Sequence, residues 1–105
     1  MANTIMQGTT PTFVLTLPNT VDLTTAQNVY VTFEQGSQNS LTKKGEELVV
    51  YANQVEVYLS QKETLKFKEG EVFMQMNWTF NNGKRAATYK VKLDWDYNLL
   101  RKEVQ

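Results

Sequence analysis

Apolar residues recur at every second position along much of this chain. Three such sets are Phe13-Leu15-Leu17, Val29-Val31-Phe33 and Val55-Val57-Leu59. A period of two is typical of a β-strand that buries one face, because successive side chains point to opposite sides of a sheet. We predict strands over residues 4–7, 12–17, 28–34, 41–44, 47–51, 54–59, 71–80 and 86–96. Turn-forming residues recur about every 8–12 positions, which indicates an all-β fold with about seven or eight short antiparallel strands.

The best-defined unit is a hairpin around Asn82-Gly83. Asn-Gly is the preferred pair for a two-residue type I′ turn, in which both central residues have positive φ. With this pair at the tip, Trp78 lies opposite Ala87, and the large apolar residues of both strands share one face. The same register pairs Phe80 with Arg85, Met76 with Tyr89, Met74 with Val91 and Val72 with Leu93.

Two short helical turns are predicted from their capping residues. Ser60 and Glu63 have the spacing of a capping box, in which each side chain accepts a backbone N–H of the other residue. Asp22 has the position of an N-cap before Leu23. The predicted core lies between two sheets and comprises Phe13, Leu15, Val31, Phe33, Val57, Leu59, Met74, Met76, Trp78, Val91 and Leu93.

Composition limits the possible classes of protein. The 105 residues suit a single domain, residues 1–105, and 41% of them are hydrophobic. Eleven basic and eleven acidic residues cancel, so no net charge steers the chain toward nucleic acid or an anionic membrane. The chain has no cysteine, and its first residues resemble no secretory signal, so we expect synthesis in a cytoplasm. No apolar run approaches the ~20 residues of a membrane span.

Candidate chemistry is sparse, because the chain has neither histidine nor cysteine. Asp94 and Asp96 share one face of a predicted strand and could contribute to a calcium site. The glycine and third carboxylate of a calcium loop are missing, which favours a solvated strand end. A glycosidase-like carboxylate pair stays open as an alternative. We expect no catalytic residue, no cofactor and no metal.

Basic and aromatic residues offer binding surfaces. Basic residues cluster near the hairpin, but interleaved acidic residues favour an ordinary solvated surface over nucleic-acid binding. Trp78 and Trp95 lie in the apolar registers of their strands, which indicates core packing rather than a sugar platform. Tyr30, Tyr58 and Phe73 lie on polar registers instead. These three aromatics either form a protein-contact surface or are covered by a tail or helical turn.

Several blocks of sequence carry a resemblance to a known family. They are residues 8–18 (GTTPTFVLTLP), 22–26 (DLTTA) and 29–33 (VYVTF). This succession resembles the N-terminal domain of baseplate upper proteins of tailed phages that infect Gram-positive bacteria. Residues 77–80 (NWTF) and 83–88 (GKRAAT) are similar to small, stand-alone prophage proteins of the same bacteria. The resemblance implies an Ig-like antiparallel β-sandwich with one or two short helical turns, used for assembly.

The leading hypothesis is therefore a non-enzymatic structural or assembly protein of a phage or prophage particle, in the tail or baseplate. Its partners would be other phage structural proteins or further copies of itself, met in the virion after synthesis in the bacterial host. Two alternatives stay open. One is a carbohydrate- or surface-binding β-sandwich module, and the other is a small hydrolase that depends on carboxylates.

Overall fold

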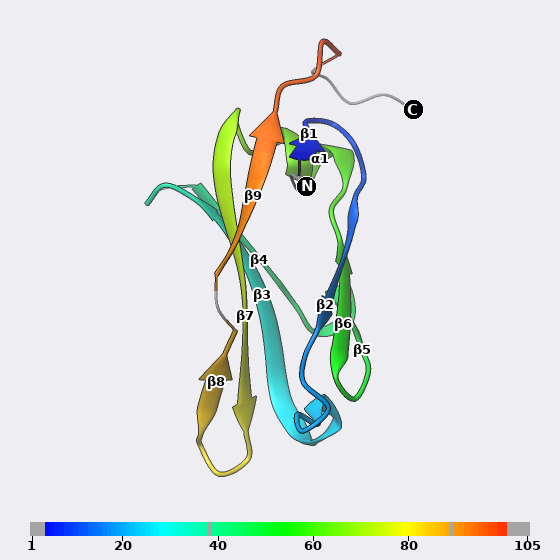
Figure 1. Ribbon diagram of the computed structural model, residues 1–105, viewed down its shortest axis with the longest axis vertical. Coiled ribbons are helices and arrows are strands. Elements are labelled where there is room, and N and C mark those ends of the chain that lie inside the picture. The colour runs from blue at the N-terminus through cyan, green and yellow to red at the C-terminus, as the bar shows by residue number, and fades with distance from the viewer. Residues whose placement is uncertain (1–3, 38, 89, 101–105) are drawn as a thin grey trace.

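The computed structural model describes residues 4–37, 39–88 and 90–100 and confirms the all-β sandwich (Figure 1). Its strands are β1 (Thr4–Met6), β2 (Thr12–Thr16), β3 (Ala26–Gln35), β4 (Asn39–Lys44), β5 (Val49–Val50), β6 (Gln54–Tyr58), β7 (Gly70–Phe80), β8 (Arg85–Ala87) and β9 (Val91–Asp96). Its helical turns are η1 (Leu23–Thr25), η2 (Gly45–Glu47) and α1 (Gln61–Leu65).

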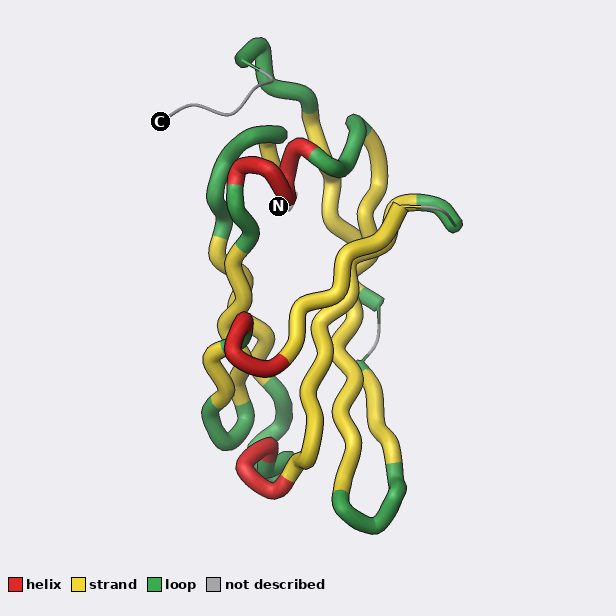
Figure 2. The backbone as a smooth tube through the Cα atoms, turned by 180° about the vertical axis from the view of Figure 1, so that it is seen from behind, coloured by secondary structure: helices red, strands yellow, loops and turns green. Residues whose placement is uncertain are grey.

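The strands form two sheets. The large sheet has the order β1-β9-β7-β3-β4, and β8 pairs with β7 beyond the start of β9. The small sheet has the order β2-β6-β5. All pairings are antiparallel except that of β1 with β9, which is parallel. Figure 2 shows η2 carrying the chain from the large sheet to the small one.

The core lies between the two sheets, as the alternating pattern predicts. Its largest fully buried side chains include Trp95, Phe33, Phe67 and Met76. Nine residues of the predicted core are buried, namely Leu15, Val31, Phe33, Val57, Leu59, Met74, Met76, Trp78 and Leu93. Phe13 is only half-buried, and Val91 is 38% exposed. Those two residues border an open side of the sandwich, which explains their exposure.

The tip of the β7–β8 hairpin differs from the prediction. The Phe80 N–H donates to the Lys84 carbonyl at 2.9 Å, so the loop has three residues, 81–83. Gly83 has a φ of +83°, and no described residue other than glycine has a positive φ. A type I′ turn needs two positive φ values, so that prediction is wrong. The longer loop moves β8 by one residue and sets Trp78 opposite Ala86 rather than Ala87.

Farther from the tip, the predicted register returns. The Val72–Leu93 and Met74–Val91 pairs are confirmed, and the predicted partner of Met76, Tyr89, lies outside the described residues. Thr88 marks the shift between the two registers. Its N–H donates to the Met76 carbonyl at 2.9 Å, and its hydroxyl accepts the Met76 N–H at 3.0 Å. The predicted 86–96 strand is therefore two strands, β8 and β9.

Both predicted helical turns are confirmed. The Glu63 N–H donates to the Ser60 hydroxyl at 3.2 Å, and the Ser60 N–H donates to the Glu63 carboxylate at 2.8 Å. Asp22 accepts the Thr24 N–H at 3.0 Å and thereby caps η1. These bonds satisfy N–H groups that a helix start would otherwise leave without partners. A third turn, η2, was not predicted; there Glu47 accepts the Lys44 N–H at 3.1 Å.

Candidate protein-binding groove

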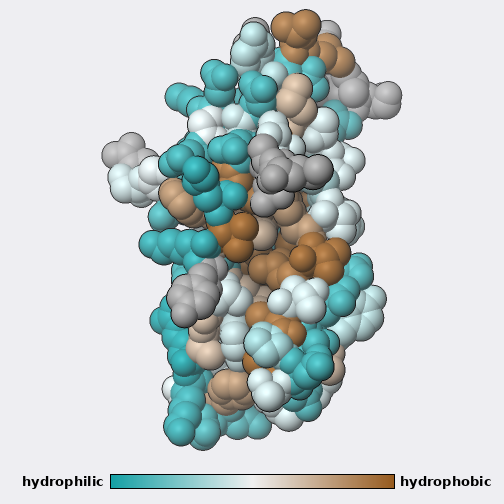
Figure 3. Space-filling view, in the orientation of Figure 1, coloured by the Kyte–Doolittle hydropathy of each residue, from teal (hydrophilic) through white to brown (hydrophobic). Residues whose placement is uncertain are grey.

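One side of the sandwich is open. A groove of ≈1160 Å³ runs between β2 of the small sheet and the β8–β9 side of the large sheet. We call this side the open seam. Figure 3 shows hydrophobic side chains gathered in the middle of this face. The residues that line the groove include Phe13, Leu17, Met74, Trp78 and Val91, and none of the lining residues carries a charge. Chemistry in the groove is thus limited to apolar packing and hydrogen bonds with uncharged groups.

Strand β2 forms one wall of the groove and is an edge of its sheet. The Leu17 N–H donates to the Asn53 carbonyl at 2.7 Å, so the odd-numbered residues of β2 direct their backbone groups toward β6. Thr12, Val14 and Thr16 therefore direct their N–H and carbonyl groups away from β6, where no described strand pairs with them. Edge strands are usually protected by charges, bulges or prolines. Strand β2 itself contains none of these.

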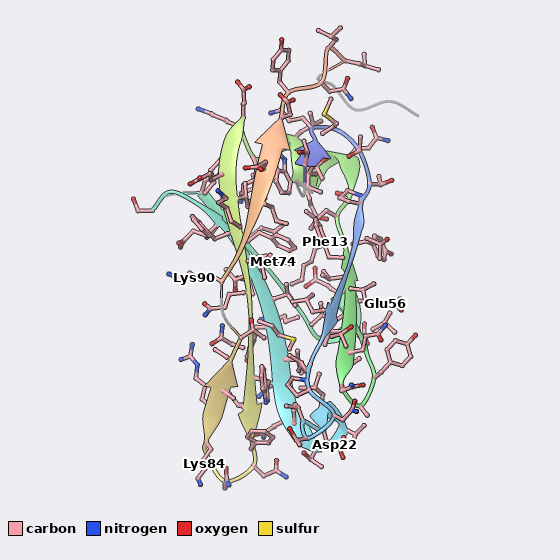
Figure 4. The ribbon with its side chains drawn as sticks, viewed as in Figure 1. Phe13, Asp22, Glu56, Met74, Lys84 and Lys90 are labelled. Carbon is pink, nitrogen blue, oxygen red and sulfur yellow. The ribbon has the colours of Figure 1, made fainter. Side chains whose placement is uncertain are left out.

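The opposite wall is protected. Its edge is interrupted where the register shifts at Thr88, between β8 and β9. Its exposed cations face away from the groove: Arg85, Lys90 and Lys92 lie on the outer face of the large sheet, where Arg85 donates to the Asn77 side chain at 3.1 Å. Figure 4 shows Lys84 at the tip of the β7–β8 hairpin and Lys90 at the side of the large sheet away from Phe13. Lys92 pairs with Glu71 at 3.3 Å, and no described carboxylate pairs with Lys84, Arg85 or Lys90.

The groove floor contains an unsatisfied donor. Trp78 lines the groove and is 6% exposed. Its indole N–H is buried and has no acceptor among the described residues. Trp95, in the same sheet, donates its indole N–H to the Thr64 carbonyl at 2.9 Å and contacts Phe67. Because a buried donor without a partner costs roughly 1–3 kcal/mol, the Trp78 N–H marks a place where an acceptor is missing.

The opposite side of the sandwich, between β4 and the segment from η2 to α1, is closed by polar bonds. We call it the closed seam. Lys43 of β4 is buried, and its ammonium lies 2.6 Å from the Glu63 carboxylate and 3.9 Å from that of Glu47. Burial alone would raise the pKa of Glu63. The hydrogen bonds from Lys43 and the Ser60 N–H outweigh this effect, so the pKa lies below its ordinary value.

The predicted contact aromatics do not form one surface. Tyr30 and Phe73 lie on the outer face of the large sheet, where Phe73 borders a hollow of ≈370 Å³ together with Lys90. Tyr58 is 63% exposed on the outer face of the small sheet, on the other side of the molecule. Their outward orientation is as predicted from the polar registers. They lie on two different faces, so protein contacts through these side chains would use two separate surfaces.

The other candidate residues lie outside the groove. Asp96 accepts the N–H of its neighbour Tyr97 at 2.9 Å, and Asp94 lies beside Glu71 across β7 and β9. Within residues 4–37, 39–88 and 90–100, no group of three or more acidic side chains could hold a metal ion. Trp78 and Trp95 are both buried, as predicted from their registers.

The groove was not predicted, although one signal for it is visible in the sequence. The first charged side chain of the chain is Asp22, so every residue before it, including all of β2, is uncharged. An edge strand without charge is unusual in a monomeric protein. The sequence does not show that β2 is an edge, however, because that depends on the order of strands in the folded sheet.

Comparisons with known proteins give no identity. No protein-family model matches the chain, and a search of curated proteins returns no match. The longest helix among the described residues is α1, with 5 residues, so none of their helices is long enough to cross a membrane.

Proposed function

We propose that this protein is a non-enzymatic structural or assembly component of a phage or prophage particle, located in the tail or baseplate. It acts by binding other structural proteins through a sheet edge. The observation that carries this proposal is the uncharged, unpaired edge of β2 beside an apolar groove. A sheet edge of this kind is a template for pairing with another chain.

The phage setting is supported by the sequence resemblance to baseplate upper proteins and stand-alone prophage proteins. Two of the resembling blocks fold into the groove region: residues 12–16 form β2, and residues 85–87 form β8. The chemistry of the groove agrees with an assembly role. Its lining offers packing surface and backbone hydrogen bonds, and it offers no carboxylate, amine or guanidinium for proton transfer.

The test is co-purification with the proteins encoded beside the gene. The chain is expressed with each neighbouring tail or baseplate protein in turn, and complexes are separated by size-exclusion chromatography with light scattering. We expect a complex of defined stoichiometry with at least one of these proteins. A wild-type chain that binds none of them, or that binds a glycan on an array, contradicts the proposal.

A further inference from the structure

We propose that Asn82 is a site of spontaneous modification, at which the side-chain amide is lost and an aspartyl or isoaspartyl residue forms. The co-reactant is water, and the product carries a carboxylate where the tip of the β7–β8 hairpin otherwise carries a neutral amide. The inference goes beyond the proposed assembly function and does not depend on it. Its basis is the sequence Asn82-Gly83, together with the exposure and the hydrogen bonds of the loop formed by residues 81–83.

The reaction joins the backbone nitrogen of Gly83 to the side-chain carbonyl carbon of Asn82. The nitrogen gives up its proton and attacks Cγ, so an N–Cγ bond forms and the Cγ–Nδ2 bond breaks. Nδ2 takes up the proton and leaves as ammonia, and a five-membered succinimide ring remains. Water then adds to one of the two ring carbonyls and opens the ring, which gives an aspartyl or an isoaspartyl residue. No atom is oxidised or reduced in these steps.

Gly83 makes the attack sterically easy. A glycine has no Cβ, so another group can approach its backbone closely. The space around Gly83 is also open, because a Cβ built on it would have no described atom within 4 Å. Asn82 and Gly83 are both exposed, and Figure 1 shows their loop at one end of the molecule. Water therefore reaches the ring that the attack would form.

The hydrogen bonds of the loop prepare the side chain of Asn82. Its Oδ1 accepts the Lys84 N–H at 3.0 Å, which is the bond of an Asx-turn and holds the side-chain carbonyl beside the intervening Gly83. The donor also polarises this carbonyl and makes Cγ more electrophilic. No described residue binds the leaving Nδ2. One bond opposes the attack, since the Gly83 N–H donates to the Phe80 carbonyl at 3.1 Å, but exposed bonds at a loop tip open readily.

Positive charge adjoins the attacking nitrogen. Lys84 and Arg85 follow Gly83 directly, both are exposed, and no described carboxylate forms an ion pair with either. A nearby cation favours the deprotonated form of a neighbouring group, and the nitrogen must lose its proton to attack. Asn81 provides an internal comparison. It is exposed in the same loop, but the residue after it is an asparagine rather than a glycine.

The two products should affect the hairpin differently. An aspartyl residue keeps the backbone unchanged, and its carboxylate can still accept the Lys84 N–H. In an isoaspartyl residue the backbone runs through Cγ, which adds one atom to the loop. That loop is closed by the 2.9 Å bond from the Phe80 N–H to the Lys84 carbonyl, so isoaspartate should loosen the tip of the hairpin. Either product adds a negative charge to a chain whose formal net charge is zero.

The experiment incubates the full chain at mildly alkaline and at mildly acidic pH and separates charge variants by ion-exchange chromatography. Peptide mapping by mass spectrometry then locates the change, and electron-based fragmentation distinguishes isoaspartate from aspartate. We expect one more acidic species, formed faster at alkaline pH and located at Asn82. Asn82→Gln should abolish this species, and Asn81→Gln, the same substitution one residue earlier, should leave it unchanged. Gly83→Ala should slow its formation about tenfold or more, because the added Cβ crowds the attacking nitrogen.

Three outcomes would overturn the inference. In the first, the acidic species maps to Asn81 or to another asparagine. In the second, it persists in Asn82→Gln. In the third, the folded chain stays unmodified under conditions that fully convert a synthetic peptide of residues 78–87, which would show that the folded loop protects Asn82. None of these results involves a tail protein, so a failure here leaves the proposed assembly function standing.

Discussion

The two seams of this sandwich are built in opposite ways. The closed seam is joined by polar bonds: the buried Lys43–Glu63 pair links β4 to α1, and the Asn39 amide donates to the Lys66 carbonyl at 3.0 Å. At the open seam, no hydrogen bond or ion pair joins β2 to β7, β8 or β9 among the described residues. The same pair of sheets thus has one side that is joined by polar bonds and one side whose strand edge and apolar floor are left open among the described residues.

Trp78→Ala should have the largest effect on stability, because the open seam depends on packing alone. We expect the free energy of unfolding to fall by ~3–5 kcal/mol, a large share of the total for a domain of this size. Urea denaturation followed by circular dichroism measures the change. A loss below about 1 kcal/mol would mean that the groove floor is loosely packed in the free protein.

Lys43→Met should have the next largest effect, because it leaves the Glu63 carboxylate partly buried without its cation. We expect a loss of about 1.5–3 kcal/mol in the free energy of unfolding. Lys92→Met is the control: it removes the Lys92–Glu71 pair, which is longer, at 3.3 Å, and whose two side chains are more than half exposed. That control should cost about 0–1 kcal/mol. Equal losses in the two variants would show that the closed seam does not depend on its buried ion pair.

Trp78 and Trp95 allow a finer comparison between an indole N–H without an acceptor at the open seam and a hydrogen-bonded one elsewhere in the core. Trp95→Phe removes the 2.9 Å bond to the Thr64 carbonyl, whereas Trp78→Phe removes a donor that has no partner in the free chain. Both substitutions delete a similar volume. Trp95→Phe should therefore destabilise the domain by about 0.5–1.5 kcal/mol more than Trp78→Phe, as measured in parallel denaturation curves. The reverse order would indicate that the Trp78 N–H finds an acceptor without a partner protein.

Acid should produce the smallest of these effects, and it should act on the closed seam. The folded-state pKa of Glu63 lies below its ordinary value of 4.5, so the native protein binds this proton less readily than the unfolded chain does. The stabilisation is therefore complete above pH 4.5 and is lost as the pH falls through the folded pKa. Denaturation midpoints measured down this range should fall less steeply for Glu63→Gln. Parallel curves for the variant and the wild type would contradict this assignment.

Local patterns predicted the elements of the fold well. Alternation placed the strands, and the spacing of Ser60 and Glu63 predicted the start of α1. The β7–β8 hairpin shows a detail that local sequence patterns cannot predict, namely the length of the loop. Asn82-Gly83 fits both a two-residue type I′ turn and a three-residue loop with Gly83 alone at positive φ. The apolar pattern did not reveal the longer loop, because the register changes by one residue between β8 and β9 and so returns to the predicted pairing. The change occurs at Thr88, whose hydroxyl accepts the Met76 N–H.

The candidate site was less accessible to prediction, because it depends on which strands lie at sheet edges. The polar registers of Tyr30, Tyr58 and Phe73 correctly indicated that they point outward. A register gives the face of a strand but not the sheet to which the strand belongs, so the separation of Tyr58 from the other two could not be deduced. The groove likewise needs β2 and β9, which are far apart in sequence, to be brought to the same side of the molecule.

The parallel pairing of β1 with β9 has a mechanical consequence. Thr4 begins the first strand of the sandwich and Asp96 ends the last one, and the two strands run side by side in the same direction. Tension applied at these two residues would slide the strands along each other, so that their hydrogen bonds, including the 2.9 Å bond from the Gln7 N–H to the Asp96 carbonyl, would be loaded together in shear. An antiparallel pair pulled from adjacent ends would instead open one bond at a time. The β1–β9 pair is therefore arranged to resist the separation of its two outer ends in shear.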